Sequence, residues 1–278
     1  MSTAVLYANF AIQALCSLGT VTTNPIIFVS QRKRRKGITQ LSMIFAHLSL
    51  HALFASTTLV YSSCELFSLF HPRSLEITFW TGSAQASALL VTGISDLFVA
   101  IDRLLAITYP TTYCATIKKK MIVSSIVVSL AVMAAVCFTL ARTRVYPEPG
   151  RSFAFLDLVD QDVLLVTTFA TIAFDVLYEL ATLVFVLKLR KFKQRVASRN
   201  ESAPGDKRGF KCANTIVVYE TILVALFCTF PFAIHVICTN GFNLPTIEFL
   251  GPYLITLITV YLFSCSMLYC VQLRKKKT

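Results

Sequence analysis

Seven long apolar segments constrain the fold of this chain more than any other feature of its sequence. Each has about 20 residues or more, the length that an α-helix needs to cross a bilayer. Helices satisfy every backbone hydrogen bond inside lipid, and the short alternating strands of a membrane barrel are not found here. Only 14% of the residues are charged, whereas a soluble domain usually carries about 25%. We therefore expect an all-α membrane protein.

The predicted architecture is a single seven-transmembrane helix bundle over residues 1–278. Its expected spans are residues 4–30, 39–70, 79–108, 121–142, 162–187, 214–239 and 247–272. An odd number of spans puts the two termini on opposite sides of the membrane. Residues 193–211 mix basic residues with Ser, Asn, Pro and Gly, which predicts a flexible basic cytoplasmic loop.

The basic residues are distributed very unevenly between the loops. Of the 26 Lys and Arg residues, 22 lie on one side of the predicted bundle, in residues 32–36, Arg103 with 118–120, 188–211 and 274–277. The four on the other side are Arg73, Arg142, Arg144 and Arg151. Because cytoplasmic loops attract Lys and Arg, we expect the N-terminus outside and the C-terminus inside. The predicted location is the plasma membrane, with several passes through it.

The net charge of +12 follows mostly from this topology. A nucleic-acid-binding protein gathers its basic residues on one water-facing surface, with aromatic residues among them. Here apolar spans separate the basic groups, so we expect no nucleic-acid partner. Anionic lipid headgroups are the expected partners of the basic loop edges.

The third apolar segment ends in Ile-Asp-Arg-Leu-Leu-Ala-Ile-Thr-Tyr-Pro, residues 101–110. The charged pair Asp102 and Arg103 therefore lies at the membrane boundary on the basic side. This stretch resembles the Asp-Arg-Tyr switch that ends the third helix of rhodopsin-like (class A) G-protein-coupled receptors, with Leu104 in place of Tyr. Three further positions agree with that family's D-R-x-x-A-I-x-x-P pattern, namely Ala106, Ile107 and Pro110. The resemblance implies that Arg103 is released on activation to meet the C-terminal helix of a Gα subunit.

The sixth and seventh segments carry weaker matches to the same family. Cys228-Thr229-Phe230-Pro231 resembles the C-W-x-P hinge, with Thr229 where the Trp belongs. Pro231 removes one backbone hydrogen bond and is expected to kink the helix. Tyr269 is what remains of the N-P-x-x-Y pattern. The resemblance implies a hinge at Cys228 and Pro231 and a place for Tyr269 in the switch.

The resemblance implies a ligand-activated receptor that is not an enzyme, uses no cofactor and promotes nucleotide exchange on a heterotrimeric G protein. The chain lacks the cysteines of the disulfide that joins the third helix to the second outer loop in this family, since neither 79–108 nor 143–161 contains one. Such losses make it more similar to divergent nematode serpentine chemoreceptors than to aminergic or peptide receptors. The expected ligand is a small molecule.

Gln85 lies in the outer half of the third segment, at the depth where amine receptors place a salt-bridging Asp. A neutral amide there argues against a cationic amine as the ligand. Phe79, Ser83 and Ser87 flank it. We expect these four residues to line the ligand site.

Several ionisable residues lie inside the predicted spans, where a charged group is expensive and faces the bundle interior. Asp96 lies about two turns before Arg103, and His47 and His51 are its potential partners in the second segment. They form either a His–Asp bridge between segments or separate hydrogen bonds to carbonyls and water. With Glu220 of the sixth segment, His51 and Asp96 form the expected intramembrane polar cluster.

Asp175 and Glu179 lie four residues apart on one face of the fifth segment. Two carboxylates at this spacing repel each other unless one is protonated or a cation lies between them. They either support a proton- or cation-linked conformational change or accept hydrogen bonds from hydroxyls such as those of Tyr178 and Tyr219.

Two other functions compete with the receptor. The helical spacing of His47 and His51 suits metal binding, as in a membrane zinc hydrolase that would add His235 and either Asp96 or Glu220. A proton-coupled transporter would use the intramembrane carboxylates as a relay, but such proteins usually contain internal repeats and none is found here. We expect the receptor, with no bound metal.

Overall fold

A computed structural model describes residues 3–32, 38–68, 71, 74–109, 113, 117–146, 154–198, 207–242, 244, 246 and 250–274. The long helices are α1 (Thr3–Arg32), α2 (Ile38–Phe67), α3 (Leu75–Thr108), α5 (Lys118–Arg142), α6 (Gln161–Ser198), α7 (Lys207–Val224) and α10 (Tyr253–Arg274). The shorter ones are η2 (Phe155–Leu158), η3 (Ala225–Thr229), α8 (Phe230–Val236) and η4 (Ile237–Gly241). Within these residues the chain has no strand beyond one isolated bridge, which confirms the all-α prediction.

The outer surface of the bundle is apolar, whereas its interior contains charged groups. Leu15, Phe138 and Val166 are 64% to 70% exposed, while Asp96 and Glu220 are buried. Soluble monomers rarely expose contiguous apolar patches of large size, but lipid covers such a surface without cost. Six of the helices are long and apolar enough to cross a membrane. These features are those of a multi-pass membrane protein.

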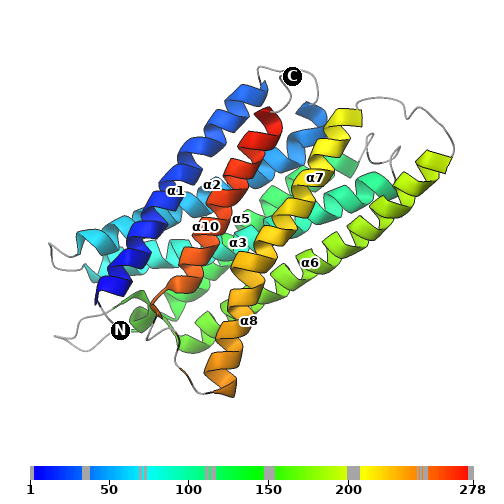
Figure 1. Ribbon diagram of the computed structural model, residues 1–278. Coiled ribbons are helices and arrows are strands. Elements are labelled where there is room, and N and C mark those ends of the chain that lie inside the picture. Colours follow the sequence, from blue (N-terminus) through cyan, green and yellow to red (C-terminus); the bar gives the residue numbers. More distant parts are fainter. Residues whose placement is uncertain are drawn as a thin grey trace.

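The long helices close into a ring around α3 (Figure 1). Helix α1 contacts both α2 and α10, and α7 contacts both α6 and α10. Helix α3 contacts α2, α5 and α6. The first turn of α1 and the last turn of α10 lie at opposite ends of the bundle. This arrangement places α3 at the centre, with a neighbour on several sides.

Helix α3 is not among the six membrane-capable helices. Its buried residues include nearly every polar side chain of its middle, from Ser83 to Arg103. A helix that is enclosed by other helices needs no apolar face toward lipid, so polar residues are tolerated wherever they find partners. The seven-span count therefore stays a prediction for α3, while six spans are supported by length and composition.

Several helix boundaries differ from the predicted ones. Helix α6 continues to Ser198 and α7 begins at Lys207, so the flexible loop predicted over 193–211 is wrong at both ends, and residues 199–206 lie outside the described residues. Lys, Arg and Gln favour helices, which allows α6 to continue beyond the apolar segment. Helix α10 begins at Tyr253 instead of residue 247, directly after Gly251 with a φ of 67°.

The sixth segment is an irregular helix. A π-helical turn, η3, lies directly before Pro231, and the backbone N–H of Phe230 donates to the carbonyl of Ala225, five residues earlier. Pro231 has no N–H to donate to Phe227, one turn before it. Such π-turns occur mostly as single bulges within α-helices and frequently at functional sites. The irregularity thus lies where the sequence predicts a hinge.

Candidate functional site

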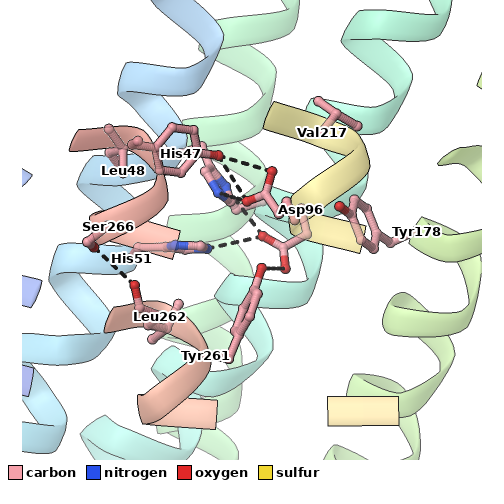
Figure 2. A network of polar contacts seen from close by, with 12 residues as sticks. His47, Leu48, His51, Asp96, Tyr178, Val217, Tyr261, Leu262 and Ser266 are labelled. Carbon is pink, nitrogen blue, oxygen red and sulfur yellow. Dashed lines mark hydrogen bonds and ion pairs between the residues drawn. The ribbon is translucent and has the colours of Figure 1, made fainter. Parts of the chain in front are cut away.

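The expected His–Asp bridge is present at the centre of the bundle (Figure 2). His47 and His51 lie one turn apart on α2, so both project from the same face of that helix. Nε2 of His51 lies 3.1 Å from Oδ1 of Asp96 on α3, and Nδ1 of His47 lies 3.4 Å from the same oxygen. The two imidazole rings are 3.8 Å apart between centroids. Of the two arrangements that the sequence allows, the structure has the bridge.

Glu220 of α7 joins this bridge through His47. Oε1 of Glu220 lies 2.7 Å from Nε2 of His47, and the hydroxyl of Tyr269 on α10 donates to both carboxylate oxygens at 3.0 Å. The expected cluster of His51, Asp96 and Glu220 therefore forms one network, with His47 as its link. Tyr269, which the sequence predicts to be part of the switch with Asp102 and Arg103, belongs to this network.

Two further side chains complete the network. The hydroxyl of Tyr261 on α10 donates to Oδ2 of Asp96 at 2.9 Å, and Oγ of Ser95 lies 2.8 Å from Nδ1 of His47. We call the whole set the polar centre; it consists of His47, His51, Ser95, Asp96, Glu220, Tyr261 and Tyr269. All its members are buried, and they come from four helices, α2, α3, α7 and α10. A buried polar group without a partner is costly, so these mutual contacts hold the four helices in one arrangement.

The Asp102 and Arg103 pair lies at the end of α3 and is also buried. Nε of Arg103 donates to Oδ2 of Asp102 at 2.9 Å, and a second guanidinium nitrogen reaches the same oxygen. The hydroxyl of Tyr113 donates to the other oxygen of Asp102. Tyr113 is not predicted as a site residue, because it lies beyond the helix. Pro110 of the same pattern lies outside the described residues.

The four residues predicted to bind a ligand do not share one face. Phe79, Ser83 and Ser87 recur every four residues and lie on one side of α3, whereas Gln85 points elsewhere because two residues correspond to about 200° of helix rotation. Ser83 Oγ and Gln85 Nε2 are buried and have no hydrogen-bond partner among the described residues. The hydroxyl of Ser87 donates to the carbonyl of Ser83 at 2.7 Å.

The segment that contains η2, between α5 and α6, packs against this part of α3. Phe155 of η2 lies so close to Gly82 that a Cβ at this glycine would be 2.3 Å from its ring. Phe79 is buried in the same apolar cluster as Phe155 and Tyr61. The N-terminal part of α3 is thus packed against Phe155, and it contains the two unpaired polar groups of Ser83 and Gln85.

A surface ion pair anchors the loop to the start of α3. Arg144 donates from its two terminal nitrogens to the two carboxylate oxygens of Glu76, at 3.0 and 2.7 Å, and its guanidinium lies 4.4 Å from the ring centroid of Phe79. The hydrogen bond from Arg144 lowers the pKa of Glu76 and raises that of Arg144. Bidentate geometry of this kind is the strongest form of such a pair.

This pair predicts a pH dependence of stability. The folded-state pKa of Glu76 is below its ordinary value of 4.5, so the pair stabilises the fold above that pH and loses its effect as the pH falls through the lowered pKa. The thermal unfolding midpoint of the wild type should exceed that of Glu76→Gln near neutral pH, by a small amount since the side chain of Glu76 is exposed. The two midpoints should converge in strong acid. A difference that persists or grows there would contradict the assignment.

Two further hydrogen bonds of the fifth and sixth segments are made to residues outside the polar centre. The hydroxyl of Thr229 in η3 donates to Oε1 of Glu179 at 2.6 Å, and Tyr178 hydrogen-bonds to Thr221 at 3.1 Å. Tyr219 is exposed. For Glu179 the hydroxyl alternative is therefore met, by one hydroxyl, that of Thr229, and not by Tyr178 or Tyr219.

The other predicted residues have local partners. Cys228 is buried in the main apolar cluster next to the π-turn. His235 lies 2.5 Å from the hydroxyl of Thr246 and does not belong to the group of His47, His51 and Asp96, whose ligand atoms lie within 4.8 Å of one another. The metal-ligand set with His235 that a hydrolase would use is therefore not assembled.

No protein-family model matches this sequence, and no curated protein is significantly similar to it.

Proposed function

We propose that this protein is a seven-helix receptor of the plasma membrane that binds a small molecule and promotes nucleotide exchange on a Gα subunit. The observation that carries the proposal is the end of α3. Arg103 is buried and held by Asp102, which also accepts a hydrogen bond from Tyr113. A buried guanidinium with a dedicated partner is expensive to build and is suited to release. We call Asp102, Arg103 and Tyr113 the latch. The resemblance to rhodopsin-like receptors, of the divergent chemosensory kind, suggests its function.

The polar centre supports the proposal as the coupling element. Glu220 lies on α7, N-terminal to the π-turn η3 and to Pro231. An outward movement of this part of α7 would separate Glu220 from His47 and from Tyr269, whose contacts hold it in the present arrangement. A ligand that binds better to the arrangement with separated partners would shift the population toward it. The same movement opens space beside Arg103 for the C-terminal helix of Gα.

The proposed orientation has the N-terminus outside the cell, based on the unequal distribution of Lys and Arg. An epitope tag before Met1 should be reached by antibodies on intact cells, and a tag after Thr278 only after permeabilisation. The matched control is the same pair of tags on a membrane protein of known topology. The reverse pattern would overturn the orientation and, with it, the access of Arg103 to a cytoplasmic G protein.

The hinge proposal predicts an effect of Pro231→Ala on signalling. The substitution restores an N–H that can donate to the carbonyl of Phe227 and allows a regular α-helix to replace the π-turn. Nucleotide exchange that is raised by Asp102→Asn should fall several-fold when Pro231→Ala is added. Pro25→Ala is the matched control, because Pro25 also lies inside a helix, on the exposed side of α1. Equal effects of the two proline substitutions would argue against a hinge at Pro231.

The direct test of the proposed function is nucleotide exchange on purified G-protein heterotrimers by the reconstituted chain. No ligand is needed for this test, since variants of the latch should raise the exchange by themselves.

A further inference from the structure

Three side chains of the polar centre present ligand atoms to a common point. One atom from each of His47, His51 and Asp96 lies within 4.8 Å of the other two, and all three residues are buried. We propose that these residues bind a divalent transition-metal ion of the zinc type, which links α2 to α3. This inference is independent of the receptor function.

The distances fit metal ligation. Oδ1 of Asp96 lies 3.1 Å from Nε2 of His51 and 3.4 Å from Nδ1 of His47. Zinc bonds to histidine nitrogen and carboxylate oxygen are about 2.0–2.2 Å long, and at tetrahedral angles they separate neighbouring ligands by about 3.3–3.6 Å. The two nitrogen-to-oxygen distances are thus close to this range, and the three ligand atoms all lie within 4.8 Å of one another. Figure 2 shows the three side chains directed toward one another from α2 and α3.

Two of the three residues, His47 and Asp96, are also held by outer partners, whereas Nδ1 of His51 is buried without a hydrogen-bond partner among the described residues. Nε2 of His47 lies 2.7 Å from Glu220, so its N–H is directed to that carboxylate and Nδ1 is left for an ion. Oδ2 of Asp96 accepts a hydrogen bond from Tyr261, which leaves Oδ1 for an ion. Carboxylate–histidine pairs of this kind orient metal ligands in known sites. The fourth position is available to Ser95 Oγ, 2.8 Å from Nδ1 of His47, or to water.

Charge and ligand type favour the same ion class. A ligating histidine is neutral, so the buried groups would carry the charges of Asp96 and Glu220 alone. A divalent cation balances these two carboxylates, and the seven residues of the polar centre include no Lys or Arg. Two nitrogens and one oxygen suit zinc and its neighbours among the transition metals, while calcium and magnesium prefer oxygen ligands throughout. Because the outer partners lie on α7 and α10, the ion would stabilise all four helices in this arrangement.

The first experiment measures zinc on the purified full chain. The protein in detergent micelles is stripped with a chelator, loaded with Zn²⁺, desalted and analysed for metal, and the affinity is obtained by competition with a chromophoric chelator. We expect one ion per folded chain. Asp96→Asn and His51→Ala should lower the affinity by more than about tenfold, and Tyr261→Phe, which keeps all three ligands, by about 10- to 100-fold. His235→Ala is the matched control and should keep the wild-type affinity, because His235 is paired with Thr246 elsewhere.

A second measurement needs no variant and separates this site from cysteine binding. The described residues include seven free cysteines, which also bind zinc. Co²⁺ bound to the wild-type chain should show the visible bands of nitrogen and oxygen ligation without the near-ultraviolet charge-transfer band of a thiolate. The proposal is overturned if the folded wild type retains no ion, if the thiolate band dominates, or if His235→Ala and Tyr261→Phe lower the affinity equally.

Discussion

Replacement of Glu220 by alanine is expected to lower the free energy of unfolding by about 2–6 kcal/mol, because it leaves two buried polar groups without a partner. Glu220 is fully buried and is the acceptor for His47 and Tyr269. Without it, an imidazole N–H and a phenol remain without partners in an apolar bundle, and each unpaired group costs about 1–3 kcal/mol. No nearby water-filled surface compensates this loss, since His47 and Tyr269 are buried as well.

The effect is measured as the thermal unfolding midpoint in micelles. Unfolding is monitored by the reaction of the buried Cys228 and Cys265 with a thiol-sensitive dye. Glu220→Ala should lower the midpoint by several degrees, and Glu220→Gln, which keeps one acceptor, by less. Glu76→Ala is the matched control, because Glu76 is exposed and its ion pair contributes little. Equal shifts for Glu220→Ala and Glu76→Ala would show that the polar centre does not stabilise the bundle.

Replacement of Asp102 by asparagine is expected to raise basal nucleotide exchange about tenfold or more. The substitution removes the charge that holds Arg103, and hydrogen bonds to charged groups contribute about 1.5–3 kcal/mol each. A change of 1.4 kcal/mol corresponds to a factor of ten in the equilibrium between held and released Arg103. Asp102 accepts hydrogen bonds from both Arg103 and Tyr113, so its loss weakens the latch on both sides.

Tyr113→Phe gives a milder version of the same prediction. It removes the hydrogen bond from the phenol to Asp102 but leaves the ion pair, so basal exchange should rise by less than with Asp102→Asn. Tyr109→Phe is the matched control, because Tyr109 lies four residues earlier and is exposed. A rise with Tyr109→Phe equal to that with Tyr113→Phe would argue against Tyr113 as part of the latch.

The helices were predictable from hydropathy because lipid demands long apolar segments, and α1, α2 and α5 begin and end within a few residues of the expected bounds. The end of α6 and the beginning of α7 were not predictable in this way. Charged residues such as Lys191 end an apolar span, but they continue a helix equally well. The beginning of α10 depends on the turn at Gly251, and hydropathy carries no information about such a turn.

The polar centre was predictable in part. A buried Asp96 requires a partner, and His47 and His51 were the two candidates in the second segment. The cost of burial alone does not distinguish a His–Asp bridge from separate hydrogen bonds to carbonyls and water. The link from His47 to Glu220 and the hydroxyls of Tyr261 and Tyr269 depend on how α7 and α10 are rotated about their axes. The sequence does not define this rotation, because an aromatic residue is equally suited to lipid and to the interior.

The outer end of α3 illustrates the same limit. The spacing of Ser83 and Ser87 correctly puts them on one face, and the periodicity of a helix also separates Gln85 from them. The prediction grouped the four residues because they lie at a similar depth in the membrane. To line one ligand site, their side chains must also point in the same direction from α3. The contact of Phe155 with Gly82 comes from a loop and could not be predicted from the pattern of the helices.

In the proposed mechanism, Arg103 acts on a G protein once its contacts with Asp102 are released. The most direct measurement is the rate of nucleotide exchange on purified heterotrimers of each Gα class in the presence of the reconstituted chain. Asp102→Asn should accelerate exchange on at least one class relative to the wild type, and adding Arg103→Ala should abolish that acceleration while the protein stays folded. No acceleration on any class, or an acceleration that survives Arg103→Ala, would contradict the account.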